Sequence, residues 1–513
     1  MSFNKSEKEV NMAKIAVWSA SSNMIGTLVS FLVRTIFIRT LGAQYLGLNG
    51  LFSNVLMVLS LADLGIASAL NFRLYKPIEC NDIETVGRLM NYYRRVYSLI
   101  AVAIFMLGMI LLPFVDFFVN TSESIPEDVN LKLIFFLNLM SSVSSYLFVY
   151  RTALLNADQR GDMVARLGIV YTLVSNLAQV VILIASHKYI LYLSWSVCST
   201  IIWNIFVNRW IGRRYPAVFA VRGLPEKQTR KAILCDTRGS MCHKLGDTVI
   251  NGTDNILLTK IFSLTTTGLY SNYAMIFSCI KTFLLQILGK FDATFGNERS
   301  KVSTEEFYGF FKRMSFINYW IAAAVTVCIY VLMNDFITVW LGERYLLDKL
   351  SLIILSANFY TSIARTILIS FTNSSGLFVK DKIRPFIEAV INLIVSIFAA
   401  FHVGIAGIFI GTFVSFVCTV GWREPYILFH FEFGKSVSEF WKYYLPFAAV
   451  TVFACSLADL IRENLMISLN FAIWVLEAIV VFVYINALMV LVFHRTEICR
   501  QVVGMVNGYR RKQ

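Results

Sequence analysis

Charged residues are scarce in this chain. They make up 15% of its 513 residues, whereas hydrophobic residues make up 57% and the mean hydropathy is +0.64. This composition excludes an ordinary soluble domain. Alternating apolar and polar segments of about ten residues are also missing, which excludes a membrane β-barrel. The sequence therefore predicts an all-α integral membrane protein.

The spacing of cysteine and histidine indicates no disulfide and no metal site. The nine cysteines are scattered, with no Cys-x-x-Cys pair and no histidine at ligand spacing, so we expect neither disulfides nor a metal site nor a cofactor. The N-terminal segment MSFNKSEKEVNMAK contains no short apolar core followed by a small-residue cleavage site. We therefore expect no removable signal peptide, and we expect the first helix to direct insertion.

Long hydrophobic stretches are what the chain does have. About 20 apolar residues at 1.5 Å each cross the roughly 30 Å hydrocarbon core, and lipid leaves the helix as the form that satisfies the backbone. We predict about 14 transmembrane helices, at 12–38, 44–70, 92–118, 131–154, 164–186, 189–211, 239–261, 266–290, 313–334, 350–373, 385–401, 404–426, 441–460 and 467–493.

The distribution of cations predicts the topology. With residue 1 inside, the inside segments hold 34 Lys and Arg and the outside segments hold 7. Cytoplasmic loops carry such an excess, so we expect a multi-pass protein of the cell (cytoplasmic) membrane with both termini cytoplasmic. Because the charges are spread over eight short segments facing anionic lipid, they do not indicate nucleic-acid binding.

The sequence also contains an internal repeat. LGAQYLGLNGLF between the first two helices resembles SLTTTGLYSNYA between helices seven and eight, and their Gly-Leu pairs begin at Gly47 and Gly268, 221 residues apart. Two six-helix lobes related by pseudo-two-fold symmetry follow, with a cavity expected between them and with two C-terminal helices that we expect to line a hydrophobic groove. The predicted domains are the N-terminal lobe 1–211, a cytoplasmic linker 212–238, the C-terminal lobe 239–430, and helices 13 and 14 with a cytoplasmic tail, 431–513.

Five cations fall inside the predicted helices: Arg34, Lys244, Lys281, Arg365 and Arg423. Lys244 and Arg423 are close enough to helix ends to snorkel. The other three lie about 12–14 Å from an end, where a charge must face protein or water. We expect them to face a hydrated cavity, with a structural ion pair as the alternative. Cations gathered there would bind an anionic group, and arginine adds bidentate recognition of phosphate.

Polar stripes mark a second candidate site. Helix 239–261 carries Asp247 and Asp254 on one face, and Glu388 and Asn392 are one turn apart on helix 385–401. With the hydroxyl of Thr412, these oxygens suit Na⁺, and a shielded carboxylate alone could carry H⁺. The alternatives are a Lys244–Asp247 pair and a position of Glu388 near the membrane surface.

Two stretches carry a family resemblance: RTLGAQYLGLNGLFSNVLMVLSLADLGIASAL and KIRPFIEAVINLIVSIFAAFHVGIAGIFIGTFVS. With the count of fourteen helices, they resemble the polysaccharide transporters of the multidrug/oligosaccharidyl-lipid/polysaccharide (MOP) exporter superfamily, which include Wzx-type O-antigen and capsule repeat-unit flippases. The resemblance implies a flippase that moves an undecaprenyl-pyrophosphate-linked glycan by alternating access, coupled to an H⁺ or Na⁺ gradient. The buried cations would bind the pyrophosphate.

We expect the protein to be a monomer that works beside a polysaccharide polymerase and chain-length proteins. A multidrug antiporter of the same superfamily is the first alternative, although the two extra helices and the cationic excess argue against it. A membrane polymerase or ligase is the second, and it would need a large external loop that this chain lacks. We therefore expect a transporter and not an enzyme.

Overall fold

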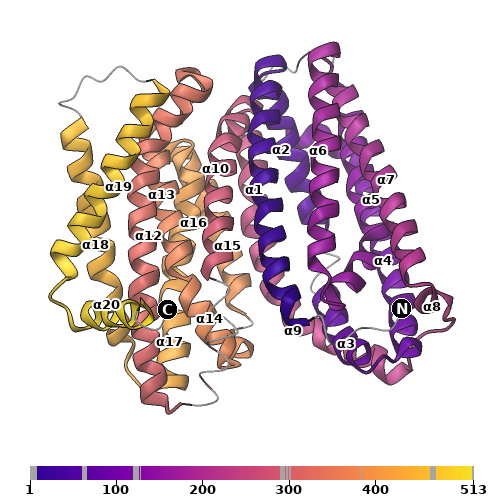
Figure 1. Cartoon of the computed structure of the whole chain (residues 1–513). Helices are drawn as coiled ribbons and strands as arrows, with labels where there is room; N and C mark the ends of the chain where they lie inside the picture. Colours follow the sequence, from indigo (N-terminus) through magenta and orange to yellow (C-terminus); the bar gives the residue numbers. More distant parts are fainter. Residues whose placement is uncertain are drawn as a thin grey trace. The chain divides into compact units, whose positions relative to one another are not determined.

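A computed structural model describes residues 8–60, 66–119, 126, 129–288, 295, 299, 302–381, 383–462 and 470–510. Every regular element within these ranges is a helix, which confirms the all-α prediction. By its internal contacts the chain divides into two compact units, Met1–Gly268 and Leu269–Gln513. Each unit is a bundle of long helices (Figure 1).

The first unit contains the helices of the indigo-to-magenta part of Figure 1. They are α1 (Lys8–Thr40), α2 (Ala43–Leu59), α3 (Ile66–Glu79), α4 (Ile83–Leu111) with the 3₁₀ turn η2 (Leu112–Phe118), α5 (Leu131–Ala157), α6 (Gly161–Ser186), α7 (Tyr189–Arg214), α8 (Pro216–Ala220) and α9 (Lys227–Leu257) with the π-turn η3 (Leu258–Phe262). Helix α1 packs on α6, α4 and α7 both pack on α5, and α9 packs on α2.

Helix α10 (Leu264–Leu288) begins in the first unit and continues into the second. The second unit then contains α12 (Thr304–Leu341), η5 (Glu343–Tyr345), α13 (Lys349–Ala364), α14 (Thr366–Ser374), η6 (Leu377–Asp381), α15 (Arg384–Val403), α16 (Ala406–Ser415), η7 (Phe416–Val420), α17 (Gly421–Leu428), η8 (Phe429–Phe433), α18 (Val437–Arg462), α19 (Phe471–Phe493) and α20 (Glu497–Arg510). Helix α20 runs across the direction of α19 (Figure 1).

Twelve helices of the described residues are long and apolar enough to cross a membrane, so this is a multi-pass membrane protein. The other two predicted spans look different in the structure. The stretch predicted at 44–70 is an apolar helix of only 17 residues, α2, followed after 61–65 by the separate helix α3. The stretch predicted at 239–261 is the end of α9, which is 31 residues long and carries too many polar side chains to be recognised by hydropathy.

Helix α12 is the centre of the second unit. Within its most apolar window 72% of the residues are buried, because α13, α18 and α19 all pack against it. It begins with a capping box in which Ser303 and Glu306 satisfy each other's backbone amides. At its other end Arg462 of α18 forms ion pairs with Asp335 of α12 and with Glu477 of α19. The two C-terminal helices are therefore fixed to the core of this unit.

The two glycines that align in the repeat lie at close backbone contacts. A Cβ atom on Gly47 would lie 1.9 Å from the carbonyl oxygen of Leu264, and one on Gly268 would lie 2.1 Å from the carbonyl oxygen of Ala43. The contact is reciprocal, since Ala43 and Leu264 each begin a helix four residues before its glycine. Small residues allow backbones to approach in this way inside membranes, so the matching Gly-Leu pairs have a physical reason.

The predicted linker 212–238 is largely helical. It contains α8 and the first part of α9, joined by an extended turn. The side-chain amide of Asn91 on α4 donates to the carbonyl oxygens of Val221 (2.9 Å) and Gly223 (3.2 Å). This segment is therefore held against the helices of the first unit.

Candidate functional site

Five charged side chains form a buried cluster at one end of the second unit. Arg384, Asp381, Glu388 and Glu424 are each at most 7% exposed, and the side chain of Arg365 is 19% exposed. They come from η6, α15, α17 and the junction between α13 and α14. A buried charge is stable only when it is paired and hydrogen-bonded, so the arrangement of these groups decides whether this end of the unit holds together.

Arg384 is the centre of the cluster. It is the first residue of α15 and is followed by Pro385, a residue favoured at the first helical turn. Its Nε donates to Asp381 Oδ2 at 2.5 Å, its Nη1 donates to Glu388 one turn later, and its Nη2 lies 3.2 Å from Glu424 Oε1. Helical spacing places Glu388 beside it, whereas Glu424 is brought there by tertiary packing.

Arg365 binds the same glutamate. Its Nε donates to both oxygens of Glu424 at 3.0 and 2.9 Å, and its Nη2 donates to Oε1 at 2.5 Å. This fork-to-carboxylate geometry is among the strongest hydrogen-bonded ion pairs in proteins. A continuous chain of contacts thus runs from Arg365 through Glu424 and Arg384 to Glu388. The structure shows the ion pair that the sequence analysis held as the alternative, and the binding of an anion by Arg365 stays a prediction.

A neutral polar pair continues along the same face of α15. Asn392 is 1% exposed and its side-chain amide donates to Thr412 Oγ1 on α16 at 3.0 Å. Glu388, Asn392 and Ser396 all lie on the buried face of α15, one turn apart. The structure therefore brings together three of the predicted ion-coupling residues, Glu388, Asn392 and Thr412, on two neighbouring helices. The ligand set for a cation stays a prediction.

Helices α15 and α16 pack closely because of two glycines of α16. A Cβ on Gly407 would lie 2.3 Å from the backbone of Ala399, and one on Gly411 would lie 2.0 Å from Ser396 Oγ. These residues form a Gly-x-x-x-Gly motif, which permits close helix contact in membranes. The sequence analysis did not use this motif, although its spacing is visible in GIFIG.

The remaining predicted site residues lie elsewhere. Asp247 and Asp254 belong to α9 in the first unit, and the side chain of Asp247 is outside the described residues. Arg34 lies on α1 in the first unit, partly buried, and Lys281 lies exposed on α10 in the second. Convergence of Arg34, Lys281 and Arg365 on one anion, and of Asp247 and Asp254 with Glu388, therefore stays a prediction.

Three members of the cluster were missed by the sequence analysis: Arg384, Asp381 and Glu424. Arg384 and Asp381 fall in the predicted loop between helices 350–373 and 385–401, where charges are expected, and Glu424 lies close to the end of the predicted helix 404–426. An intramembrane acid is costly, as an intramembrane base is, so counting acids as well as cations inside the predicted helices would have included Glu424.

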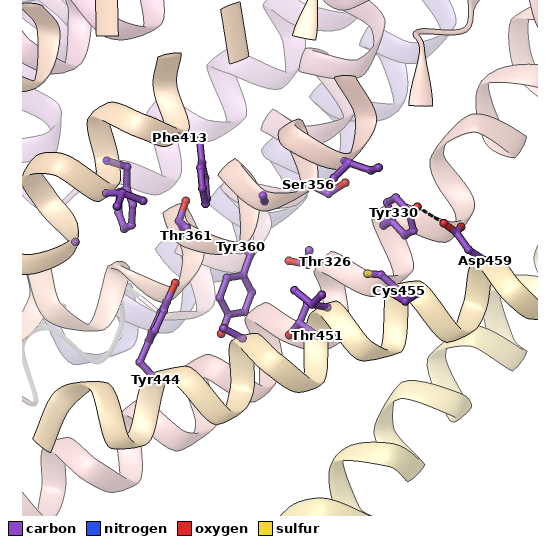
Figure 2. Close-up of a pocket in the computed structure, with 18 of the residues that line it drawn as sticks. Thr326, Tyr330, Ser356, Tyr360, Thr361, Phe413, Tyr444, Thr451, Cys455 and Asp459 are labelled. Carbon is purple, nitrogen blue, oxygen red and sulfur yellow. Dashed lines mark hydrogen bonds between the residues drawn. The ribbon is translucent and has the colours of Figure 1, made fainter. Parts of the chain in front are cut away.

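The second unit also contains an elongated cavity of about 490 Å³, which we call the α18 groove. Its wall runs along α18 from Trp441 to Asp459, about 27 Å at 1.5 Å per residue. Figure 2 shows Tyr444, Thr451 and Cys455 of α18 along one side of it. The opposite walls come from α12, α13, α16, η7 and Gly421 at the start of α17. This length is close to the thickness of a bilayer core.

The lining of the α18 groove is mainly apolar and aromatic, with a few hydroxyl groups. Those of Thr326, Ser356 and Tyr360 are buried and have no hydrogen-bond partner within the described part of the chain. At one end Tyr330 donates to Asp459 at 2.6 Å, as Figure 2 shows, and Lys349 pairs with the same carboxylate at 2.9 Å. The groove suits a long, mostly hydrocarbon ligand with an acceptor atom, or ordered water, at the hydroxyls.

Comparison with solved structures identifies the fold. Neither a family model nor a curated protein matches the sequence. The structure of the lipid II flippase MurJ in an inward closed conformation superposes with a TM-score of 0.64 at 12% identity, covering 94% of this chain and 99% of that one. A point mutant of the Vibrio cholerae MATE transporter VcmN superposes with a TM-score of 0.55 at 15% identity, covering 82% and 97%.

A third structure, a MOP superfamily transporter from Pyrococcus furiosus, gives a TM-score of 0.53 at 15% identity over 80% of this chain and 96% of that one. These likenesses show that the chain has the fold of the MOP transporters.

Proposed function

We propose that this protein is a flippase that moves an undecaprenyl-pyrophosphate-linked oligosaccharide repeat unit from the cytoplasmic to the outer leaflet of the cell membrane, for surface polysaccharide biosynthesis. The observation that carries the proposal is the α18 groove, an apolar cavity about as long as the bilayer core is thick, lined by the first of the two C-terminal helices. A polyprenyl tail has the length and apolar character that this groove suits.

The fold and the buried cations support the same proposal. The lipid II flippase structure matches through 94% of this chain, and its substrate, by its name, is lipid-linked. Arg34, Lys281 and Arg365 are the groups we assign to the pyrophosphate. At Arg365 the substrate would share or displace the Glu424 carboxylate, since one guanidinium fork cannot bind both anions bidentately.

A reconstitution experiment tests the proposal. Proteoliposomes containing the purified chain and a fluorescent undecaprenyl-pyrophosphate oligosaccharide should move the label to the opposite leaflet, measured by its accessibility to a membrane-impermeant quencher. Empty vesicles provide the background rate. A background rate with this substrate, combined with transport of a cationic dye, would favour the multidrug antiporter of the same superfamily.

Replacing Arg34, Lys281 or Arg365 by alanine should each lower this flipping rate by about tenfold or more, because a charge-assisted hydrogen bond to phosphate contributes about 1.5–3 kcal/mol. Lys188→Ala removes an exposed cation at the start of α7 and should leave the rate unchanged. Unchanged rates in all three variants, at wild-type protein levels, would contradict the pyrophosphate assignment.

We further propose that Glu388, Asn392 and Thr412 couple transport to an H⁺ or Na⁺ gradient. Glu388→Gln should abolish the dependence of the flipping rate on an imposed gradient, because the amide neither releases a proton nor attracts a cation as a carboxylate does. Thr412→Val removes the hydroxyl that Asn392 contacts. This variant distinguishes the two coupling ions, because it should weaken the dependence of the flipping rate on Na⁺ and leave its dependence on H⁺ unchanged. Glu439→Gln, at a partly exposed position in the first turn of α18, is the control.

The proposed partners follow from this role. The lipid-linked glycan would be passed to a polysaccharide polymerase and chain-length proteins on the outer face, with the flippase itself acting as a monomer. The excess of cations in alternate loops supports a cytoplasmic location for both termini. Cysteine-free protein carrying single introduced cysteines would report this orientation by labelling from each side.

A further inference from the structure

A second cavity in the second unit, of about 430 Å³, shares no lining residue with the α18 groove. Its wall contains Lys380, Asp381, Arg384 and Arg423 together with Ile383, Ile387, Cys418, Thr419 and Trp422. These residues come from η6, the first turn of α15, η7 and α17. We call it the Lys380–Arg423 pocket. Nothing in the proposed transport cycle uses it.

The charge of this pocket is positive. Asp381 is paired with Arg384, whose Nε donates to it at 2.5 Å. The buried cluster contains two arginines and three acids, so adding Lys380 and Arg423 gives a net formal charge of +1. Lys380 and Arg423 form no ion pair within the described ranges, and each lies over an aromatic ring instead: Lys380 Nζ is 3.2 Å from the centroid of Phe431, and the Arg423 guanidinium is 5.8 Å from that of Tyr426. The two cations therefore have charge available for an anion.

The remaining lining is apolar and exposed. Ile383 is 71% exposed and Trp422 is 51% exposed. From Ile383 an exposed apolar stripe continues along α15 through Ile387, Val390 and Ile394, on the face opposite the buried charged cluster. Helix α15 has 20 residues, about 30 Å, so its first turn lies at one surface of the hydrocarbon core. Tryptophan is favoured at that depth.

We propose that the Lys380–Arg423 pocket binds the phosphate headgroup of an anionic bilayer phospholipid, whose acyl chains lie along the exposed stripe of α15. A soluble phosphate would use the two cations and leave Trp422, Ile383 and Ile387 exposed to water, whereas a phospholipid contacts both kinds of residue. The positive-inside distribution puts this end of α15 on the cytoplasmic side, where anionic lipids create a negative surface potential.

The site has a consequence for the charged cluster. Arg384 contributes to the pocket wall and also contacts Glu388 and Glu424. A headgroup phosphate in the pocket adds an anion next to this guanidinium. Occupancy of the pocket therefore acts on the same arginine that holds the two glutamates.

The test uses the full-length protein in nanodiscs of equal parts phosphatidylglycerol and phosphatidylcholine. After transfer to detergent, the retained lipid is measured by native mass spectrometry. The wild-type protein should retain more phosphatidylglycerol than phosphatidylcholine. Because each cation near the surface contributes about fivefold to the binding of an anionic lipid, Lys380→Gln with Arg423→Gln should lower that preference by about 25-fold. Equal preference in wild type and double variant would overturn the proposal.

Two further variants make the result specific. Arg344→Gln removes an exposed arginine that also lies over a tyrosine ring, 5.0 Å from the centroid of Tyr345, and it should leave the preference unchanged. Trp422→Ala keeps both cations and should weaken retention of phosphatidylglycerol. Displacement of the lipid by millimolar inorganic phosphate, with full retention in Trp422→Ala, would assign the pocket to a soluble anion and overturn the lipid assignment. Thermal unfolding of each variant checks that it is folded.

Discussion

Replacing Glu424 by glutamine should destabilise the protein by about 3–5 kcal/mol, because it removes the buried carboxylate that binds the Arg365 guanidinium and one of the three carboxylates that contact Arg384. Glu424 is 6% exposed, so little water can reach this position to solvate the arginines in place of the carboxylate. The midpoint of thermal unfolding in detergent, followed by circular dichroism, should fall clearly. Protein levels in the membrane should fall with it.

The matched control is Glu84→Gln. Glu84 also pairs with an arginine, Arg88, but its side chain is 68% exposed, and exposed pairs of this kind contribute little. The double variant Glu424→Gln with Arg365→Gln should recover part of the lost stability, because it also removes the cation whose bidentate ion pair is lost. A Glu424→Gln protein as stable as wild type would contradict the view that this cluster holds α13, α15 and α17 together.

Hydropathy predicted the long apolar helices well and the polar ones poorly. The stretch predicted at 385–401 is α15, Arg384–Val403, because a proline and a glycine mark its two ends. The stretch predicted at 239–261 belongs to a helix that begins at Lys227, and no apolar signal marks that beginning. Helix α2 ends at Leu59, although the sequence that follows, SLADLGIASAL, is apolar enough for the prediction to continue the helix to residue 70.

Residues of the candidate site were predictable where they are close in sequence. Glu388 and Asn392 are one helical turn apart, so their common face follows from spacing alone. The partner of Arg365 is 59 residues away, and its position depends on how α14, which follows Arg365, packs against α17. The π-helical segment η7 precedes α17 and changes the direction in which Glu424 points relative to a regular α-helix. No pattern in the sequence indicated that turn, so the pairing could not be predicted.

Substituting alanine for Gly47 should destabilise the first unit by forcing apart the backbones that meet at the two repeat turns. The added Cβ would lie 1.9 Å from the carbonyl oxygen of Leu264, where ordinary contact begins near 3.4 Å, and neither backbone is a flexible group that can rotate away. The start of α2 must then move away from the start of α10. Overpacking of this kind typically lowers the free energy of unfolding by about 1–3 kcal/mol. Gly268→Ala should have the same effect, because its Cβ would lie 2.1 Å from the carbonyl oxygen of Ala43.

The reciprocity of the contact makes the prediction sharper. Both substitutions separate the same two helix starts, so the Gly47→Ala, Gly268→Ala double variant should be less destabilised than the sum of the single variants. Gly26→Ala on α1, where no heavy atom lies within 4 Å of the added Cβ, should leave the unfolding midpoint unchanged or slightly raised. Additive losses in the double variant would mean that the glycines act separately. In that case the Gly-Leu repeat would reflect two independent turns and not one shared contact.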